Sequence, residues 1–204
     1  MFYIGIDLGQ KRDYTAIAIL EKENARLINR PRDYMALPRV LPKLLLRRLE
    51  RVPLGTPWPR IVDRIRSITH EPPFAGRCAL AVDGTGVGAP VVDMLLESRP
   101  GCDLTAVTIT GGDQASRRNW PWVAVPRRDL ITGVQLALEK GVLRIARTLP
   151  EADALRRELV AMRADRTSPK TSGEEHDDLV LALALACWRS QRKSVYPGGR
   201  LLGF

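Results

Sequence analysis

The chain has 204 residues, of which 45% are hydrophobic, so it can form one domain with a sizeable buried core. Its net charge is +9, and arginine rather than lysine supplies most of its 32 basic residues. A basic excess of this size favours a polyanionic partner, most commonly nucleic acid, although a GC-rich genome that favours arginine codons would give the same composition.

The N-terminal part predicts an antiparallel meander followed by an irregular segment. Strands are expected at residues 1–7, 14–20 and 25–29, because the connections between these apolar runs are short. Residues 32–58 are rich in proline around the apolar and basic piece PKLLLRRLERV, which we interpret as a helical insertion or flap. This interpretation places four arginines on a basic or solvated side of the segment: Arg39, Arg47, Arg48 and Arg51.

The remainder of the chain alternates helices and strands. Helices are expected at 61–68, 87–97, 127–140, 152–166 and 178–189, and strands at 78–83, 104–110 and 142–145. The polar loops 111–121 and 167–173 separate some of them, and the tail 191–204 is expected to be flexible. This order predicts one α/β domain over residues 1–190, with a mixed five-stranded sheet whose first three strands are antiparallel and whose later strands are parallel.

Cysteine content and hydropathy indicate the compartment. The three cysteines are far apart and lack metal-binding spacing, which is typical of small apolar side chains in a reducing environment. The N-terminal residues are expected to form a strand rather than a signal peptide. The longest apolar run, at 179–188, is too short to span a bilayer. We therefore expect a soluble, intracellular protein.

Two apolar strands end in aspartate, at Asp7 and Asp83. Either residue alone is explained as a turn former, but an unpaired buried carboxylate at a strand end is costly. If the two strands are adjacent and parallel, their ends lie about 5 Å apart and the carboxylates raise each other's pKa. A divalent cation removes this penalty, and all-oxygen ligands favour Mg²⁺ or Mn²⁺, with room for two ions about 4 Å apart.

The stretch GEEHDDLVLALALACW, residues 173–188, offers a third carboxylate. Asp178 lies in the first turn of an apolar helix and is the preferred metal ligand, with Asp177 as the alternative; either could also cap the helix. His176 is interpreted either as a group that orients water at the metal or as an exposed residue at the helix start. Glu174 and Glu175 are expected to lie in the preceding loop.

Five segments occur in a recognisable order: GIDLGQKRDYTAIAIL, LAVDGTGVGAPVVDML, VTITGG, VPRRDLITGVQLALEKGVLRI and GEEHDDLVLALALACW. Together they resemble the C-terminal nuclease domain of phage terminase large subunits, which package viral genomes. The resemblance runs from residue 1 to about residue 190 and is weakest over 32–58. It implies a ribonuclease H-like fold, shared with Holliday-junction resolvases, and hydrolysis of double-stranded DNA by an endonuclease with two Mg²⁺ or Mn²⁺ ions.

The resemblance also implies roles for individual residues. Asp7, Asp83 and Asp178 match the metal-binding acids, with Asp177 and then His176 as further catalytic candidates. The candidate DNA-binding residues are Arg117, Arg118, Arg127, Arg128, Lys11, Arg12, Arg166 and Lys170. Their contacts would be mostly to phosphates, and therefore salt-sensitive and sequence-tolerant. Family members commonly have a lysine before DLI, where this chain has arginines that cannot exchange a proton at neutral pH.

The sequence contains no G-x-x-x-x-G-K-[ST] phosphate loop, so the packaging ATPase is not part of it. We expect either a nuclease domain made separately or a stand-alone relative, acting in the cytoplasm of a phage-infected or prophage-carrying bacterium. Its expected partners are double-stranded DNA and, in a packaging role, the ATPase, the small terminase subunit or the portal; no membrane partner is expected.

Three alternatives stay open at this point. A resolvase of branched DNA would use the same fold and the same acids. The segments GIDLG and DGTG also resemble the phosphate loops of actin-like ATPases and sugar kinases, although those proteins need two lobes. An inactive DNA-binding module is disfavoured, because all three acid positions are filled.

Overall fold

The computed structural model describes residues 1–9, 13–23, 42–86, 88–117, 119–164 and 177–192. The expected strand at 25–29, the loop at 167–173 and most of the tail lie outside these residues. None of the helices in the described ranges is long and apolar enough to cross a membrane.

A single mixed sheet forms the centre of the described structure, with eight strands in the order β6-β7-β5-β4-β1-β2-β3-β8. The strands are β1 (Phe2–Asp7), β2 (Thr15–Glu23), β3 (Lys43–Val52), β4 (Cys78–Asp83), β5 (Asp103–Thr110), β6 (Ser116–Arg117), β7 (Trp122–Pro126) and β8 (Leu143–Ile145). The first three strands are antiparallel, and β4, β5 and β7 continue the sheet parallel to β1. The predicted mixed α/β architecture is confirmed, in a sheet of eight strands rather than five.

The main correction concerns β3: its sequence KLLLRRLERV forms a strand of the central sheet, not part of a helical insertion or flap. Its pairing with β2 shifts register next to Ile19 and Leu20, so Arg47 is an extra residue in a β-bulge. The bulge lets Leu46 and Leu49, three residues apart, both be buried in one core. A spacing of three residues is typical of helices, which is why the sequence pattern was misleading. The strands β6 and β7 were also not predicted.

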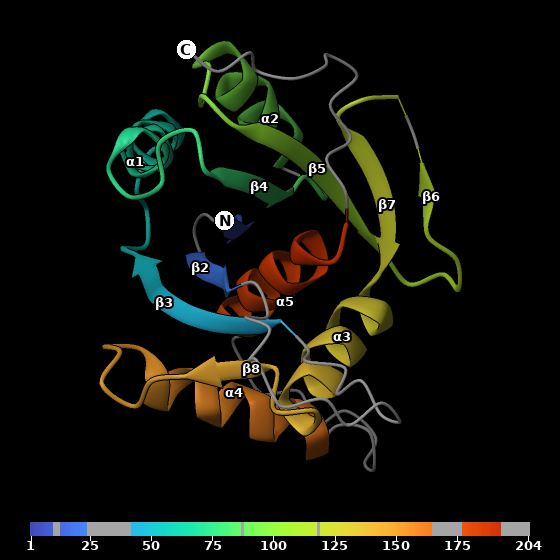
Figure 1. Ribbon diagram of the computed structural model, residues 1–204. Coiled ribbons are helices and arrows are strands. Elements are labelled where there is room, and N and C mark those ends of the chain that lie inside the picture. The colour runs from blue at the N-terminus through green and yellow to red at the C-terminus, as the bar shows by residue number, and fades with distance from the viewer. Residues whose placement is uncertain (10–12, 24–41, 87, 118, 165–176, 193–204) are drawn as a thin grey trace, which may run out of the picture.

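Helices cover both faces of this sheet, as Figure 1 shows. They are α1 (Trp58–His70), α2 (Gly88–Glu97), α3 (Arg127–Glu139), α4 (Ala152–Ala164) and α5 (Asp178–Ser190), close to the predicted bounds. On one face, α1 and α2 pack against the side chains of Ile4 and Ile6 in β1. On the other face, α5 packs against β1 and β2, and α3 and α4 pack against α5. The candidate catalytic acids described below lie on this second face, whereas the side chain of Trp122 packs on the first.

The helix α5 is buried along its whole length, which explains its continuous apolar sequence. A Cβ atom on Gly5 would lie 2.0 Å from the carbonyl oxygen of Ala182, so β1 and α5 contact each other backbone to backbone. At its far end, Arg189 forms an ion pair with Asp103 of β5, and Ser190 accepts a hydrogen bond of 2.7 Å from the Lys22 ammonium. Each buried leucine of the helix contributes about 1.5–3 kcal/mol. These contacts fix where the first turn of α5 lies.

Candidate active site

Asp7 and Asp83 end two neighbouring strands. The strands β1 and β4 are parallel, and their register pairs Ile6 with Val82, so the two aspartates that follow are side by side. Asp7 is buried and Asp83 is half-buried. The condition set out for the two acids, adjacent and parallel strands, is therefore met.

The two carboxyls interact directly and share a hydrogen bond that favours the protonated form of Asp7. Burial is the largest cause that raises the pKa of Asp7 well above its ordinary value, and the charge of Asp83 is the next. The charges of Asp177 and Asp178 raise the pKa of Asp7 further. Burial also raises the pKa of Asp83. The acids of β1, β4 and the start of α5 therefore lie close enough for their charges to act on Asp7.

The turn DGTG holds Asp83 in place. The backbone N–H of Thr85 donates a hydrogen bond of 2.8 Å to Oδ1 of Asp83, and the Thr85 hydroxyl donates to the same oxygen. The hydroxyl oxygen in turn accepts a hydrogen bond of 2.9 Å from the backbone N–H of Ile109 in β5. These bonds to Thr85 oppose the burial effect and lower the pKa of Asp83. Thr85 is thus a candidate functional residue that sequence reasoning missed. The sequence signal that could have found it is a hydroxyl residue two positions after the aspartate.

The first turn of α5 brings a third acid close enough for its charge to act on Asp7. Gly5 lies under Ala182, and Asp178 is one helical turn before Ala182 on the side toward Asp7. The Asp178 side chain is 3% exposed, and Arg51 of β3 donates to both of its oxygens. Asp177 precedes the helix, is 36% exposed and forms an ion pair with Arg127, the first residue of α3. Asp177 and Asp178, the two alternatives for the third metal ligand, therefore each pair with a different arginine.

The other predicted site residues separate into two groups. Arg128 is 59% exposed and pairs with Asp113 of the β5–β6 loop, at an N–O distance of 2.6 Å. Arg117 lies in β6, the edge strand of the sheet. The remaining predictions fall on residues outside the described ranges: His176, Arg118, Lys11, Arg12, Arg166 and Lys170.

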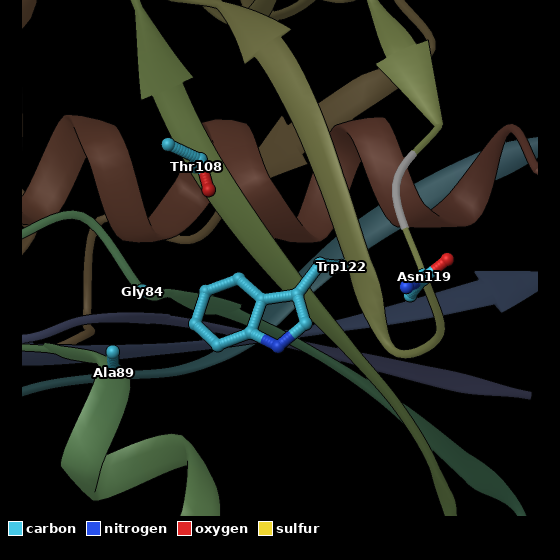
Figure 2. A pocket seen from close by; sticks show the side chains of 5 residues that line it. All are labelled: Gly84, Ala89, Thr108, Asn119 and Trp122. Atoms are coloured by element: carbon cyan, nitrogen blue, oxygen red, sulfur yellow. The ribbon is translucent and has the colours of Figure 1, made fainter.

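A pocket of about 480 Å³ opens at Gly84, the residue after Asp83, on the face of the sheet that α2 covers. Figure 2 shows the Trp122 ring at its centre, next to Gly84, with Ala89, Thr108 and Asn119 around it. The ring lies so close to Gly84 that a Cβ atom there would be 2.4 Å from the ring carbon Cζ3. The pocket is mainly apolar, offers one aromatic ring, and begins one residue from a candidate metal ligand.

The carboxylates of this site differ in how well they fit a divalent cation. Among the described residues, no three histidine, cysteine or acidic side chains converge as ready ligands of one ion. Asp177 and Asp178 face arginines instead, as described above. The pair Asp7 and Asp83 does fit a hard cation, because carboxylate oxygens are its preferred donors and the cation would replace the shared proton and offset the repulsion that raises the pKa of Asp7. The charges of Asp177 and Asp178 act on the same pair.

Comparisons with known proteins give the fold a context. No family model and no curated protein matches the sequence. Among solved structures, the large terminase nuclease from the thermophilic phage G20c is similar, with a TM-score of 0.58 and 20% identity over 95% of this chain and 83% of that chain. The fold is that of a terminase nuclease domain.

Two further structures are similar at lower identity. The terminase nuclease domain of human cytomegalovirus, soaked with Mn, gives a TM-score of 0.50 and 13% identity, over 91% of this chain and 81% of that chain. Thermus thermophilus RuvC gives a TM-score of 0.45 and 16% identity, over 93% of each chain. The two terminase nuclease structures show that the chain has their ribonuclease H-like fold, as the sequence resemblance implied. At such low identity they show the fold alone.

Proposed function

We propose that this chain is a metal-dependent endonuclease that cleaves double-stranded DNA, as the nuclease of a terminase large subunit does during genome packaging. The observation that carries this proposal is that Asp7 and Asp83 end neighbouring parallel strands of a terminase-type fold, with Asp178 on the same face near enough for its charge to act on Asp7. Burying three carboxylates near one another lowers the stability of a protein, so such clusters are typical of functional sites. The basic net charge supports a nucleic-acid substrate.

In this proposal Asp7 and Asp83, with Asp178 or Asp177, hold two Mg²⁺ or Mn²⁺ ions. The ions would supply the positive charge that activates water and stabilises the leaving oxygen of a phosphodiester. The protein's own contribution is to hold the acids rigidly, through Thr85 on one side and the first turn of α5 on the other. The solved Mn-soaked terminase nuclease domain of human cytomegalovirus supports the choice of metal.

Substrate binding is proposed for the surfaces on either side of the acids. Arg127 and Arg128 begin α3 beside Asp177, and Arg128 is well exposed for a phosphate contact. The Trp122 pocket lies on the face of the sheet that α2 covers and reaches Gly84, the residue after Asp83; there it is proposed to contact a nucleoside of the bound DNA. Residues 1–190 are the proposed nuclease domain. Its proposed partners in packaging are the packaging ATPase, the small terminase subunit or the portal.

The test is a plasmid-nicking assay with Mn²⁺, Mg²⁺ or EDTA. Wild type is compared with the isosteric variants Asp7→Asn, Asp83→Asn, Asp177→Asn and Asp178→Asn, with folding checked by circular dichroism. We expect nicking only with a metal, and a loss of about 100-fold or more for the metal ligands. Cleavage that continues in EDTA, or that none of the variants reduces, would falsify the proposal. A four-way junction run in parallel tests the resolvase alternative, which predicts preferential cleavage of that substrate.

A further inference from the structure

Arg51 lies in the same row of the sheet as the candidate catalytic acids. The register of β1 with β2 pairs Asp7 with Ala16, and the register of β2 with β3 pairs Ala16 with Arg51. Residues paired across strands project from the same face of a sheet. Asp7, Ala16 and Arg51 therefore form one row under α5, and the small side chain of Ala16 leaves space between the acid and the arginine.

The guanidinium of Arg51 is shared between two buried carboxylates. Its Nε donates to Oδ2 of Asp178 at 2.8 Å, and its Nη2 donates to Oδ1 of Asp178 at 3.2 Å. The same Nη2 forms an ion pair with Glu158 of α4. The side chains of Asp178 and Glu158 are 3% and 7% exposed, so neither charge is compensated by water.

Glu158 connects this ion pair to the start of α5. Its Oε2 accepts a hydrogen bond of 3.1 Å from the backbone N–H of Val180. The N-cap residue of α5, Asp177, makes no such bond with its own side chain. The cap of α5 is thus supplied by α4, and Arg51 holds both the capping acid and the first acid of the helix.

We propose that Arg51 is the internal counter-cation of the active site: it holds Asp178 and Glu158 in place by charge, and a divalent cation that uses Asp178 competes with it. This inference rests on the proposed function, because it concerns the same acids. Arg51 is a positioning residue in this scheme and does not contact the substrate. A buried carboxylate that loses its only strong partner is costly, so the chain without Arg51 would depend on a metal ion for its stability.

The experiment compares Arg51→Gln, Arg51→Lys and the control Arg47→Gln. Arg47 lies on the same strand and also forms an ion pair, with Glu21, but its side chain is 50% exposed. Each full-length protein is unfolded thermally in EDTA and in Mn²⁺, and Mn²⁺ affinity is measured by titration calorimetry. Neither measurement requires nuclease activity.

We expect Arg51→Gln to lower Tm in EDTA by roughly 6–20 °C, and Arg47→Gln to lower it by less than about 4 °C. Mn²⁺ should raise the Tm of Arg51→Gln by more than it raises the Tm of wild type. It should also bind Arg51→Gln at least about tenfold more tightly, because the arginine no longer repels the ion. Arg51→Lys keeps the positive charge but loses the bidentate contact with Asp178. Its affinity for Mn²⁺ should therefore be within about threefold of the wild-type affinity.

Each outcome decides between the two proposals. If wild type binds no Mn²⁺ and cleaves no DNA, the nuclease proposal fails. If wild type binds Mn²⁺ but Arg51→Gln binds it equally or more weakly, only the counter-cation role fails. If Arg51→Gln is unfolded in EDTA and recovers its helical circular dichroism in Mn²⁺, the role is supported. An Arg51→Gln chain that stays unfolded in saturating Mn²⁺ overturns it, because the ion then does not replace the arginine.

Discussion

Gly5 and Ala182 bring the strand β1 and the helix α5 into backbone contact, with the position of a Cβ on Gly5 only 2.0 Å from the Ala182 carbonyl oxygen. The same position lies 2.5 Å from the backbone nitrogen of Ala186. Helices normally pack against a sheet through side chains. The closer approach places Asp178, one turn earlier, near Asp7. The distance between the candidate metal ligands is therefore set by a residue that is chemically inert.

Replacing Gly5 by alanine should therefore be strongly destabilising. The added methyl group meets backbone atoms, which cannot move aside as a side chain can, so we expect a loss of about 3 kcal/mol or more and a fall in Tm of roughly 6–12 °C. The matched control is Gly133→Ala in α3, where an added Cβ has no neighbour within 4 Å. That substitution should raise stability by about 0.4–1 kcal/mol. Thermal unfolding of both variants measures the difference, and equal Tm values would contradict the close packing.

The acids at strand ends could be predicted from the sequence, whereas the residues that support them could not. Asp7 and Asp83 each follow an unbroken apolar run, and the parallel arrangement of such runs follows from the order of elements. Arg51 was misplaced because the bulge at Arg47 gives β3 the spacing of a helix. Thr85 follows Asp83 by two residues, which is a local signal, but its hydrogen bond from Ile109 joins two strands and has no signature in a single sequence.

The stability of the metal-free protein should fall as the pH rises, and Asp7 should account for part of the fall. Because the folded-state pKa of Asp7 is raised, its contribution is fully present below its unfolded value of about 3.9 and is lost as pH rises through the folded value. The same holds for Glu158, whose pKa burial raises to about 7. Tm measured in EDTA between pH 4.5 and pH 8 should decline more steeply for wild type than for Asp7→Asn.

Two controls accompany this measurement. The substitution Asp93→Asn removes an exposed carboxylate of α2 and should leave the slope of Tm against pH as in wild type. Mn²⁺ binds the ionised acids, so it should stabilise wild type most at the high end of the pH range. Parallel Tm curves for wild type and Asp7→Asn would show that Asp7 does not carry the raised pKa.

Thr85→Val should lower cleavage without unfolding the protein. Valine has the shape of threonine but cannot donate to Asp83 or accept from the Ile109 N–H. We expect a loss of about 10–100-fold in activity, the usual effect of removing a group that orients a metal ligand. Because the hydroxyl lowers the pKa of Asp83, the onset of activity should also move to higher pH in the variant. Thr85→Ser keeps the hydroxyl and should restore both, whereas a serine variant as weak as the valine one would refute this role.

Trp122→Leu should weaken DNA binding more than it weakens the chemical step. The ring lines the pocket at Gly84, and contact between an aromatic ring and a nucleoside is worth about 1–3 kcal/mol. We therefore expect a rise in Kd of roughly five- to 150-fold, measured by fluorescence anisotropy with Ca²⁺ in place of Mn²⁺. Trp122→Phe retains an aromatic ring and should lose less. If kcat falls while Kd is unchanged, the pocket does not bind the substrate.

Arg128→Gln should reduce the salt dependence of DNA binding. Arg128 is exposed at the start of α3, and its partner Asp113 is itself 81% exposed, so a phosphate can replace that partner at little cost. Each lost phosphate contact lowers the slope of log K against log salt concentration by about 0.9. The control is Arg64→Gln, an exposed arginine of α1 that pairs with Glu50. It is part of a helix on the opposite face of the sheet, so the slope should not change. A slope that falls equally in both variants would indicate a diffuse charge effect rather than a contact at the start of α3.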